Sequence, residues 1–230
     1  MDALQKVSCI IPFFNEREYI LDVLKVINKA NGISQVICVD DGSTDNAAEI
    51  VASEFKEVNL IRLKENYGKS HAVKKGLEAV VNEYILLVDA DLKDLNAQEI
   101  NCAITAITRY NEIDMIILRR LKAPWFIKLY RIDTLLSGER LLKANDLHRI
   151  FLNSVNGYQL EIAINLYMSR NNKKVFWSPS SALNTFKVEK LAPLKAIAKE
   201  MKMYTSLLQH AGFINLVKLV LRFGKEKLPE

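Results

Sequence analysis

Short apolar runs alternate with amphipathic segments along the first 92 residues of the chain. The runs lie at residues 7–12, 35–39, 59–63 and 84–88. Most of them lack polar alternation, which is typical of strands buried on both faces of a parallel sheet. Between them, apolar positions recur at helical spacing, and three helices are expected at residues 20–27, 46–55 and 72–81. This order predicts a doubly wound α/β sheet, with residues 84–88 as a central strand.

The pattern changes in the second half of the chain. A helix at 97–110 and a strand at 114–118 continue the first pattern, but residues 119–131 interleave cations with aromatic side chains. This stretch fits either an interfacial amphipathic helix or a helix packed on the sheet with a solvated basic face.

Further elements are expected downstream. They are a helix at 157–170, an edge strand at 175–177 and two helices after Pro193 that are separated by Gly212. We expect one α/β domain at residues 1–190, with halves 1–118 and 119–190, followed by a helical extension at 191–230. The extension either closes the sheet as a hairpin, mediates a homodimer or anchors the chain to a membrane.

Composition narrows the class of protein only a little. Half of the 230 residues are hydrophobic, and the net charge of +5 with a pI near 9.0 suits a phosphorylated substrate, an anionic membrane or nucleic acid equally well. No aromatic-basic RNA signature or helix-turn-helix pattern is present, so we expect no nucleic-acid partner. The three cysteines are odd in number and lack metal-ligand spacing, which favours core residues in a reducing compartment. No signal peptide or apolar run of about 20 residues is found, and a cytoplasmic or peripheral membrane location is expected.

Acidic residues follow three of the predicted strands. Glu16 comes after the first, Asp41 after the second, and Asp89 and Asp91 after the strand at 84–88. The carboxyl ends of parallel strands form the ligand crevice of an open α/β sheet, so these acids should meet at one edge. Carboxylate oxygens suit Mg²⁺ or Mn²⁺, and Asp89 and Asp91 are the candidate metal ligands.

Four motifs in this order resemble the family 2 glycosyltransferases of the GT-A fold, which have a Rossmann-like, mostly parallel sheet. The motifs are Ile11-Pro12-Phe13-Phe14-Asn15-Glu16, Val39-Asp40-Asp41-Gly42-Ser43-Thr44-Asp45, Asn66-Tyr67-Gly68-Lys69 and Val88-Asp89-Ala90-Asp91. More faintly, Ser137-Gly138-Glu139-Arg140 and Gly157-Tyr158-Gln159-Leu160-Glu161 resemble the branch of dolichyl- and polyprenyl-phosphate sugar synthases.

The resemblance implies a role for each matching residue in binding a UDP- or GDP-hexose donor. Pro12, Phe14 and Glu16 would line the nucleoside, Val39 and Asp41 would hold base and ribose, and Lys69 and Ala90 lie within the donor-binding motifs. Asp89 would contact ribose or sugar, Asp91 would ligate the metal, and Arg120 and Lys190 would face the diphosphate. The carboxylate of Asp41 is then expected to be unsatisfied without the nucleotide.

The resemblance also implies inverting transfer of a hexose by a single in-line displacement. The acceptor is either a polyprenyl phosphate at the cytoplasmic membrane face or a soluble saccharide or other small molecule. A non-catalytic nucleotide-sugar binder is the third reading. Glu161 is the candidate general base for an alcohol acceptor; a phosphate acceptor needs none, and Glu161 would then pair with Arg140.

Two further features bear on the acceptor and the diphosphate. The candidate ligands for a lipid phosphate are Arg119, Arg120, Lys128 and Arg131. One departure is Asn184, which stands six residues before Lys190 where the branch has a basic residue or a histidine. His71, beside Lys69, either approaches the nucleotide or is a surface residue, and the surface position is the one expected.

Overall fold

The structure is a computed structural model of the whole chain, and it describes residues 6–110, 112–121, 132–152, 159–184 and 212–229. The expected amphipathic stretch around Trp125, the candidates Lys128, Arg131 and Lys190, and the first expected C-terminal helix lie outside these residues. Among the helices of these described ranges, none combines the length and the apolar character that a membrane span requires.

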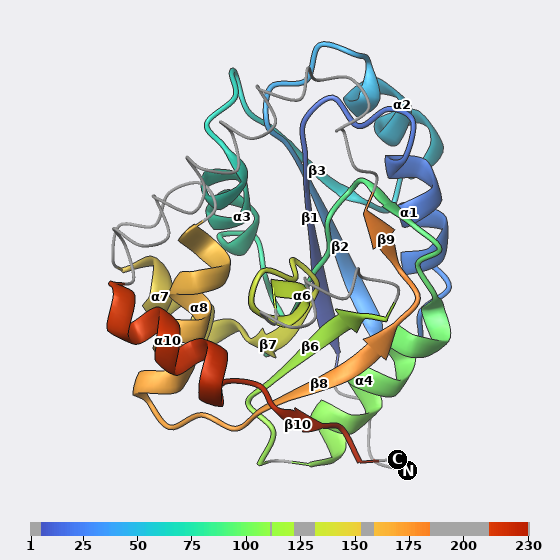
Figure 1. Cartoon of the computed structure of the whole chain (residues 1–230). Coiled ribbons are helices and arrows are strands. Elements are labelled where there is room, and N and C mark those ends of the chain that lie inside the picture. Colours follow the sequence, from blue (N-terminus) through green and yellow to red (C-terminus); the bar gives the residue numbers. More distant parts are fainter. Residues whose placement is uncertain (1–5, 111, 122–131, 153–158, 185–211, 230) are drawn as a thin grey trace.

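The described residues form a mixed α/β fold around an eight-stranded sheet (Figure 1), with the strand order β10-β8-β6-β7-β4-β1-β2-β3. These strands are β1 (Val7–Phe13), β2 (Ile33–Asp40), β3 (Asn59–Arg62), β4 (Tyr84–Leu87), β6 (Met115–Arg120), β7 (Arg140–Lys143), β8 (Val175–Ser180) and β10 (Glu226–Lys227). Strand β7 runs antiparallel to both of its neighbours, and the other pairs are parallel. A separate two-stranded ribbon joins β5 (Leu92–Lys93) to β9 (Leu183–Asn184).

Helices cover both faces of this sheet (Figure 1). One face carries α1 (Ile20–Ile27), α2 (Ala47–Glu54) and α4 (Ala97–Arg109). The other carries α3 (Lys69–Leu77), α7 (Ala144–Phe151), α8 (Gln159–Arg170) and α10 (Phe213–Arg222), with the short α6 (Ile132–Leu135) beside β6. The sheet separates two hydrophobic cores, and alternate residues of a central strand pack into each. In β1, Cys9 and Ile11 pack into one core and Ile10 packs into the other. This two-sided burial explains the unbroken apolar runs in the sequence.

The predicted fold class is confirmed, and β4 is a central strand with all four residues buried. The prediction of an edge strand at 175–177 is wrong, because β10 pairs with the outer side of β8. The C-terminal segment therefore returns to the sheet after α10. The extension at 191–230 was expected to be helical, and it also contains this strand. Helix α3 also begins at Lys69, three residues before its predicted start.

Strand β7 is an element that the apolar pattern did not predict. It lies between β4 and β6, and its register places Arg140 opposite Leu87 and Ile117. The strand is only four residues long, and the polar Ser137-Gly138-Glu139 precedes it. It places the charged Arg140 in the middle of the sheet. This inserted strand brings the second half of the chain against the end of β4.

Candidate active site

The loops after β1 and β2 are tied together by hydrogen bonds at the carboxyl edge of the sheet. The backbone N–H of Asn15 donates to Ser43 Oγ (3.0 Å), and Asn15 Oδ1 accepts from the backbone N–H of Thr44 (2.8 Å). The backbone N–H of Arg17 donates to Asp45 Oδ2 at 2.9 Å. Asn15 takes a left-handed conformation with a φ of 55°, which asparagine tolerates better than most residues. The motif residues of the two strands thus form one unit.

Asp41 connects this unit to the start of α3. Its Oδ1 accepts from the backbone N–H of Tyr67 (2.9 Å), and its Oδ2 accepts from the backbone N–H of Gly68 (2.8 Å). Asp41 is buried, with 3% of its surface exposed. The expectation that this carboxylate is unsatisfied without a nucleotide is therefore wrong, because the loop before α3 supplies both donors.

Gly42 allows the same two loops to approach closely. Its φ is +77°, and a Cβ built on it would lie 2.6 Å from the backbone carbon of Glu65. A side chain at this position would meet backbone that cannot move aside cheaply, so glycine is required for both conformation and space. We call residues 13–17, 40–45 and 65–68 the edge loops.

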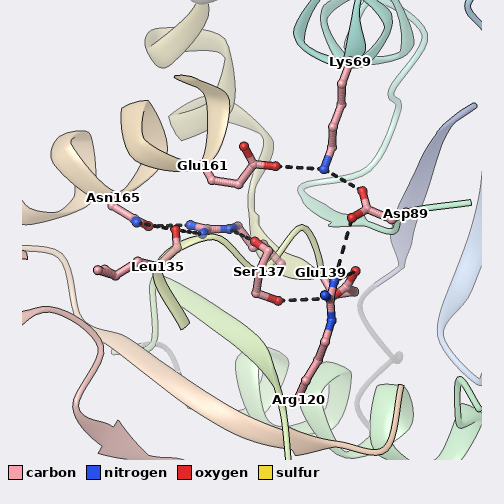
Figure 2. A network of polar contacts seen from close by, with 9 residues as sticks. Lys69, Asp89, Arg120, Leu135, Ser137, Glu139, Glu161 and Asn165 are labelled. Carbon is pink, nitrogen blue, oxygen red and sulfur yellow. Dashed lines mark hydrogen bonds and ion pairs between the residues drawn. The ribbon is translucent and has the colours of Figure 1, made fainter. Parts of the chain in front are cut away.

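A cluster of charged side chains lies beside the edge loops, at the end of β4 (Figure 2). Lys69, the first residue of α3, points its Nζ at Asp89 Oδ1 (2.6 Å) and at Glu161 Oε1 on α8 (2.8 Å). Side-chain exposure is 32% for Lys69, 21% for Asp89 and 9% for Glu161. One ammonium group therefore joins two acids from different walls of the site.

Arg120, at the end of β6, continues the cluster from below in Figure 2. Its guanidinium donates to both carboxylate oxygens of Glu139, at 2.9 to 3.2 Å, and its Nη2 lies 3.9 Å from Asp89 Oδ2. Ser137 Oγ donates to the same Glu139 at 3.0 Å. Paired carboxylate and guanidinium groups hold each other in a fixed orientation.

Sequence reasoning missed Glu139, although it lay within a quoted motif. Only 1% of its surface is exposed, so it stands in the interior beside the predicted Arg120. An acid next to the arginine of a Ser-Gly-Glu-Arg stretch was the available signal, but its partner is 19 residues away in the chain.

Arg140 is buried completely and is held by three groups around the turn after α6. Its Nε donates to the carbonyl of Ser137 (2.7 Å), its Nη2 to the carbonyl of Leu135 (2.9 Å) and its Nη1 to Asn165 Oδ1. Glu161 makes its printed ion pair with Lys69, and it acts on Arg140 through charge, as the nearby acid with the largest effect on the pKa of that arginine. We call Lys69, Asp89, Arg120, Glu139, Arg140 and Glu161 the charged cluster.

The electrostatics of the charged cluster follow from burial and from the partners of each group. Burial lowers the pKa of Arg140 to about 10, against the opposing effect of nearby acids. Burial alone would raise the pKa of Asp89, but Lys69 and then Arg120 hold it below its usual value. For Glu139 burial prevails over Arg120, and its pKa is raised. The three cations and three anions leave the charged cluster close to neutral.

Gly138 forms the wall behind Asp89. A Cβ at this position would lie 2.3 Å from Asp89 Oδ2, closer than any real contact. A side chain at Gly138 would therefore push the Asp89 carboxylate out of its present position.

The other predicted site residues lie around the edge loops and the end of β4. Pro12, Val39 and Ala90 are buried, so any contact of Val39 with a ligand would have to use its backbone. Phe14 is exposed, and Glu16 and Asp91 are half-buried. These positions fit the predicted convergence of acids at one edge.

Arg119 and His71 have partners of their own. Arg119 Nε pairs with the buried Asp133 at 2.5 Å, and its guanidinium lies over the ring of Trp177. The ring of His71 stacks on Tyr67 with centroids 4.8 Å apart. Arg119 is thus engaged by the protein, and His71 is a half-buried residue near the start of α3.

The prediction of a divalent cation can be tested against the side chains that could serve as metal ligands. Across the ranges that the structure describes, no group of three or more His, Cys, Asp or Glu side chains could hold a metal ion. Mg²⁺, however, commonly uses one or two carboxylates together with substrate phosphates and water. Asp91 at the rim suits that requirement, whereas Asp89 already faces Lys69 and Arg120.

Comparison with solved structures places the fold in the GT-A class of glycosyltransferases. A structure of glucosyl-3-phosphoglycerate synthase from Mycobacterium tuberculosis, in complex with Mn²⁺, UDP and phosphoglyceric acid, matches with a TM-score of 0.71. The match covers 90% of this chain and 79% of that chain at 18% identity. A structure of the same enzyme with Mg²⁺ and UDP matches with a TM-score of 0.70 over 90% of this chain and 80% of that chain at 19% identity.

The sequence then gives the family. The model described as "Glycosyl transferase family 2" matches residues 8–151, more than half of the chain, and the chain belongs to this family.

Relatives by sequence include enzymes that act on lipid phosphates. An undecaprenyl-phosphate 4-deoxy-4-formamido-L-arabinose transferase from Yersinia enterocolitica is 32% identical over 40% of this chain and 31% of its own length. A dolichyl-phosphate beta-glucosyltransferase from Dictyostelium discoideum is 34% identical over 40% of this chain and 34% of its own. The chain thus spans about a third of the length of these relatives. An uncharacterized protein of Methanocaldococcus jannaschii is 30% identical over 72% of this chain and 83% of its own length.

Proposed function

We propose that the chain is an inverting, metal-dependent glycosyltransferase that moves a hexose from a UDP- or GDP-hexose to a polyprenyl phosphate at the cytoplasmic membrane face. The observation that carries this proposal is the convergence of the motif residues. The edge loops and the end of β4 bring Asp41, Asp89 and Asp91 to one edge of the sheet, where Lys69 and Arg120 stand beside Asp89.

The donor would lie along the edge loops, with its diphosphate toward the end of β4. Solved structures of the same fold hold UDP or UDP-glucose with Mn²⁺, which supports a nucleotide-sugar donor. Phe14 offers an exposed ring for the nucleoside, and Asp41 holds the loop before α3 in the conformation that the donor would meet. Sheet geometry supports this placement, because ligands of open α/β sheets bind outside the carboxyl ends of the strands.

The protein's own groups would orient the reacting parts and stabilise the charge that develops as the nucleoside diphosphate leaves. Arg120, fixed by Glu139, would face the diphosphate, and Asp91 would hold the Mg²⁺ or Mn²⁺. When bound, the metal supplies positive charge to the leaving diphosphate. A phosphate acceptor is already anionic at pH 7 and needs no general base, which is consistent with Glu161 being engaged by Lys69.

The lipid-phosphate acceptor is supported by the names of the relatives with undecaprenyl-phosphate and dolichyl-phosphate substrates. A second candidate is a soluble small-molecule acceptor with the same donor chemistry. It is favoured by the engagement of Arg119 with Asp133 and of Arg120 with Glu139, which occupies two predicted ligands of a lipid phosphate. In that case Glu161 would be the base for an alcohol acceptor.

A transfer assay separates these possibilities. Labelled UDP-glucose and GDP-mannose are incubated with the protein, Mn²⁺ and either undecaprenyl phosphate in anionic liposomes or a set of soluble phosphorylated acids and saccharides. The proposal predicts label in the lipid fraction. Label only in a soluble product would favour the second candidate, and binding of donor without turnover on any acceptor would favour a non-catalytic binder.

A further inference from the structure

Helix α10 carries apolar side chains on its outer side as well as on its inner side. Leu219, and Phe223 at the end of the helix, are buried in the core that α10 shares with α8. On the outer side, Ile214, Val217 and Leu221 recur at helical spacing and are 69%, 39% and 58% exposed. We call these three residues the outer stripe. Single exposed apolar residues are common, but a row of them on one side of a helix indicates an interaction surface.

Exposed basic residues lie beside the outer stripe. Lys218 is the i+4 neighbour of Ile214, and Arg222 is the i+4 neighbour of Lys218. Lys225, which follows the helix, is exposed as well, and α10 itself contains no Asp or Glu. Long basic side chains can lay their methylene groups along apolar surface and keep their charges in a polar layer. An apolar stripe with cations beside it is typical of a helix that lies in the surface of an anionic membrane.

The length and the charge of α10 decide between the possible occupants of the outer stripe. The helix has ten residues, about half of the number that a spanning helix needs, so it suits a position along a membrane surface. In a symmetric contact with a second copy, Lys218 and Arg222 would face the same cations of the partner helix, and like charges repel. An anionic lipid surface instead complements these charges.

We propose that the outer stripe and the cations beside it dock the protein on an anionic membrane surface, with the three apolar side chains inserted among the lipids. This inference rests on the lipid-phosphate acceptor of the proposed function, and it names the surface that brings the site to that acceptor. Helix α10 packs against α8, which carries Glu161 of the charged cluster (Figure 1). The docking surface therefore lies on a helix that contacts a helix of the site.

Co-sedimentation of the full chain with vesicles tests the proposal. The vesicles consist of phosphatidylglycerol and phosphatidylcholine, and neither polyprenyl phosphate nor donor is present. The wild type should bind them at low salt and release them as the salt concentration rises. Ile214→Ser/Leu221→Ser keeps every charge and should bind at least about tenfold more weakly, because two apolar side chains no longer enter the lipid. Failure of the wild type to bind, or unchanged binding by this double variant, would overturn the proposal.

A pair of charge variants separates α10 from the net charge of the protein. Lys218→Gln/Arg222→Gln removes two charges beside the outer stripe and should weaken vesicle binding at least about tenfold. The matched control is Lys25→Gln/Lys29→Gln, which removes two exposed charges in and just after α1, on the opposite face of the sheet, and should stay within about twofold of wild type. Equal losses in the two variants would show that net charge alone attracts the lipid, and would overturn the proposal.

Two further measurements cover a second copy of the chain and the chemistry of the site. Sedimentation velocity without vesicles should give the same oligomeric state for the wild type and Ile214→Ser/Leu221→Ser; a dimer that dissociates in the variant would assign the outer stripe to a second copy instead. The same variant should keep its sugar transfer to a short-chain, water-soluble polyprenyl phosphate, because both substituted side chains are exposed on α10. Vesicle binding is read without donor or acceptor, so it can fail while sugar transfer succeeds, and the reverse.

Discussion

The edge loops and the charged cluster meet at the same end of the sheet, but they are held together in different ways. In the edge loops, short polar side chains bond to backbone N–H groups, as Asn15 does with Thr44 and Asp41 with Tyr67 and Gly68. In the charged cluster, long side chains from distant elements bond mainly to one another. Local chain geometry therefore holds the edge loops in place, whereas charge balance holds the charged cluster.

The largest effect on transferase activity should come from substitution of Asp91, which follows β4 between the edge loops and the charged cluster. Asp91→Asn removes the carboxylate proposed to hold the metal, and transferase activity should fall at least about a thousandfold because charge on the leaving diphosphate is no longer stabilised. The measurement is a transfer assay over a range of Mn²⁺ concentrations, with circular dichroism as the check on folding. Activity close to wild type would remove Asp91 from the site.

A buried ion pair of the charged cluster should matter more for stability than an exposed one elsewhere. Glu139→Gln leaves Arg120 without its buried anionic partner and should lower the free energy of unfolding by about 3 kcal/mol. The matched control is Glu112→Gln, whose pair with Lys174 is exposed and should be worth less than about 1 kcal/mol. Urea unfolding of both variants measures the difference, and equal losses would show that the charged cluster is not a distinctive source of stability.

In the edge loops, two glycines allow the cost of a steric clash to be distinguished from the cost of an unfavourable backbone conformation. Gly42 and Gly68 both have a positive φ, but only at Gly42 would a Cβ meet the backbone of Glu65. Gly68→Ala should therefore cost about 1 kcal/mol of stability from backbone strain alone, and Gly42→Ala about 2 to 3 kcal/mol. Thermal unfolding of the two variants tests this order, and a reversed order would mean that the loops can separate without cost.

The smallest effect concerns acid stability. The folded pKa of Asp89 lies below its unfolded value of about 3.9, so its stabilising contribution is complete above that pH and is lost as the pH falls through the folded pKa. Asp89→Asn removes this contribution. Urea unfolding between pH 7 and pH 3 should show a shallower loss of stability below about pH 4 in the variant than in the wild type. Parallel curves would mean that Lys69 and Arg120 do not stabilise the ionised carboxylate.

The sequence predicts most of the edge loops, because each motif directly follows an apolar strand and parallel strands bring their carboxyl ends to one edge. Asp41, Asp89 and Asp91 were placed there on this basis, and the structure agrees. The helix start at Lys69 was missed because Asp41, 27 residues before Gly68, supplies the hydrogen bond acceptor for the start of α3. Local helix propensity cannot predict such a contact between residues far apart in the chain.

The charged cluster is much harder to predict, since its geometry depends on β7. This strand has four residues, begins with the buried Arg140 and runs antiparallel between β4 and β6, where no strand was expected. Glu161 was expected to be either the base for an alcohol acceptor or a partner of Arg140, yet Arg140 bonds to Asn165 and Glu161 pairs with Lys69. Ion-pair partners 92 residues apart are decided by tertiary packing.

The edge loops and Asp91 should together bind one nucleotide diphosphate and one divalent cation. Thermal unfolding of the wild type and of Asp91→Asn with UDP-glucose, with Mn²⁺ and with both tests it directly, because a ligand that binds only the folded state raises the melting temperature. We expect the melting temperature of the wild type to increase clearly only when both ligands are present, and we expect no such increase for Asp91→Asn. An increase of equal size in the two proteins, or none with UDP, GDP, TDP or CDP sugars, would contradict it.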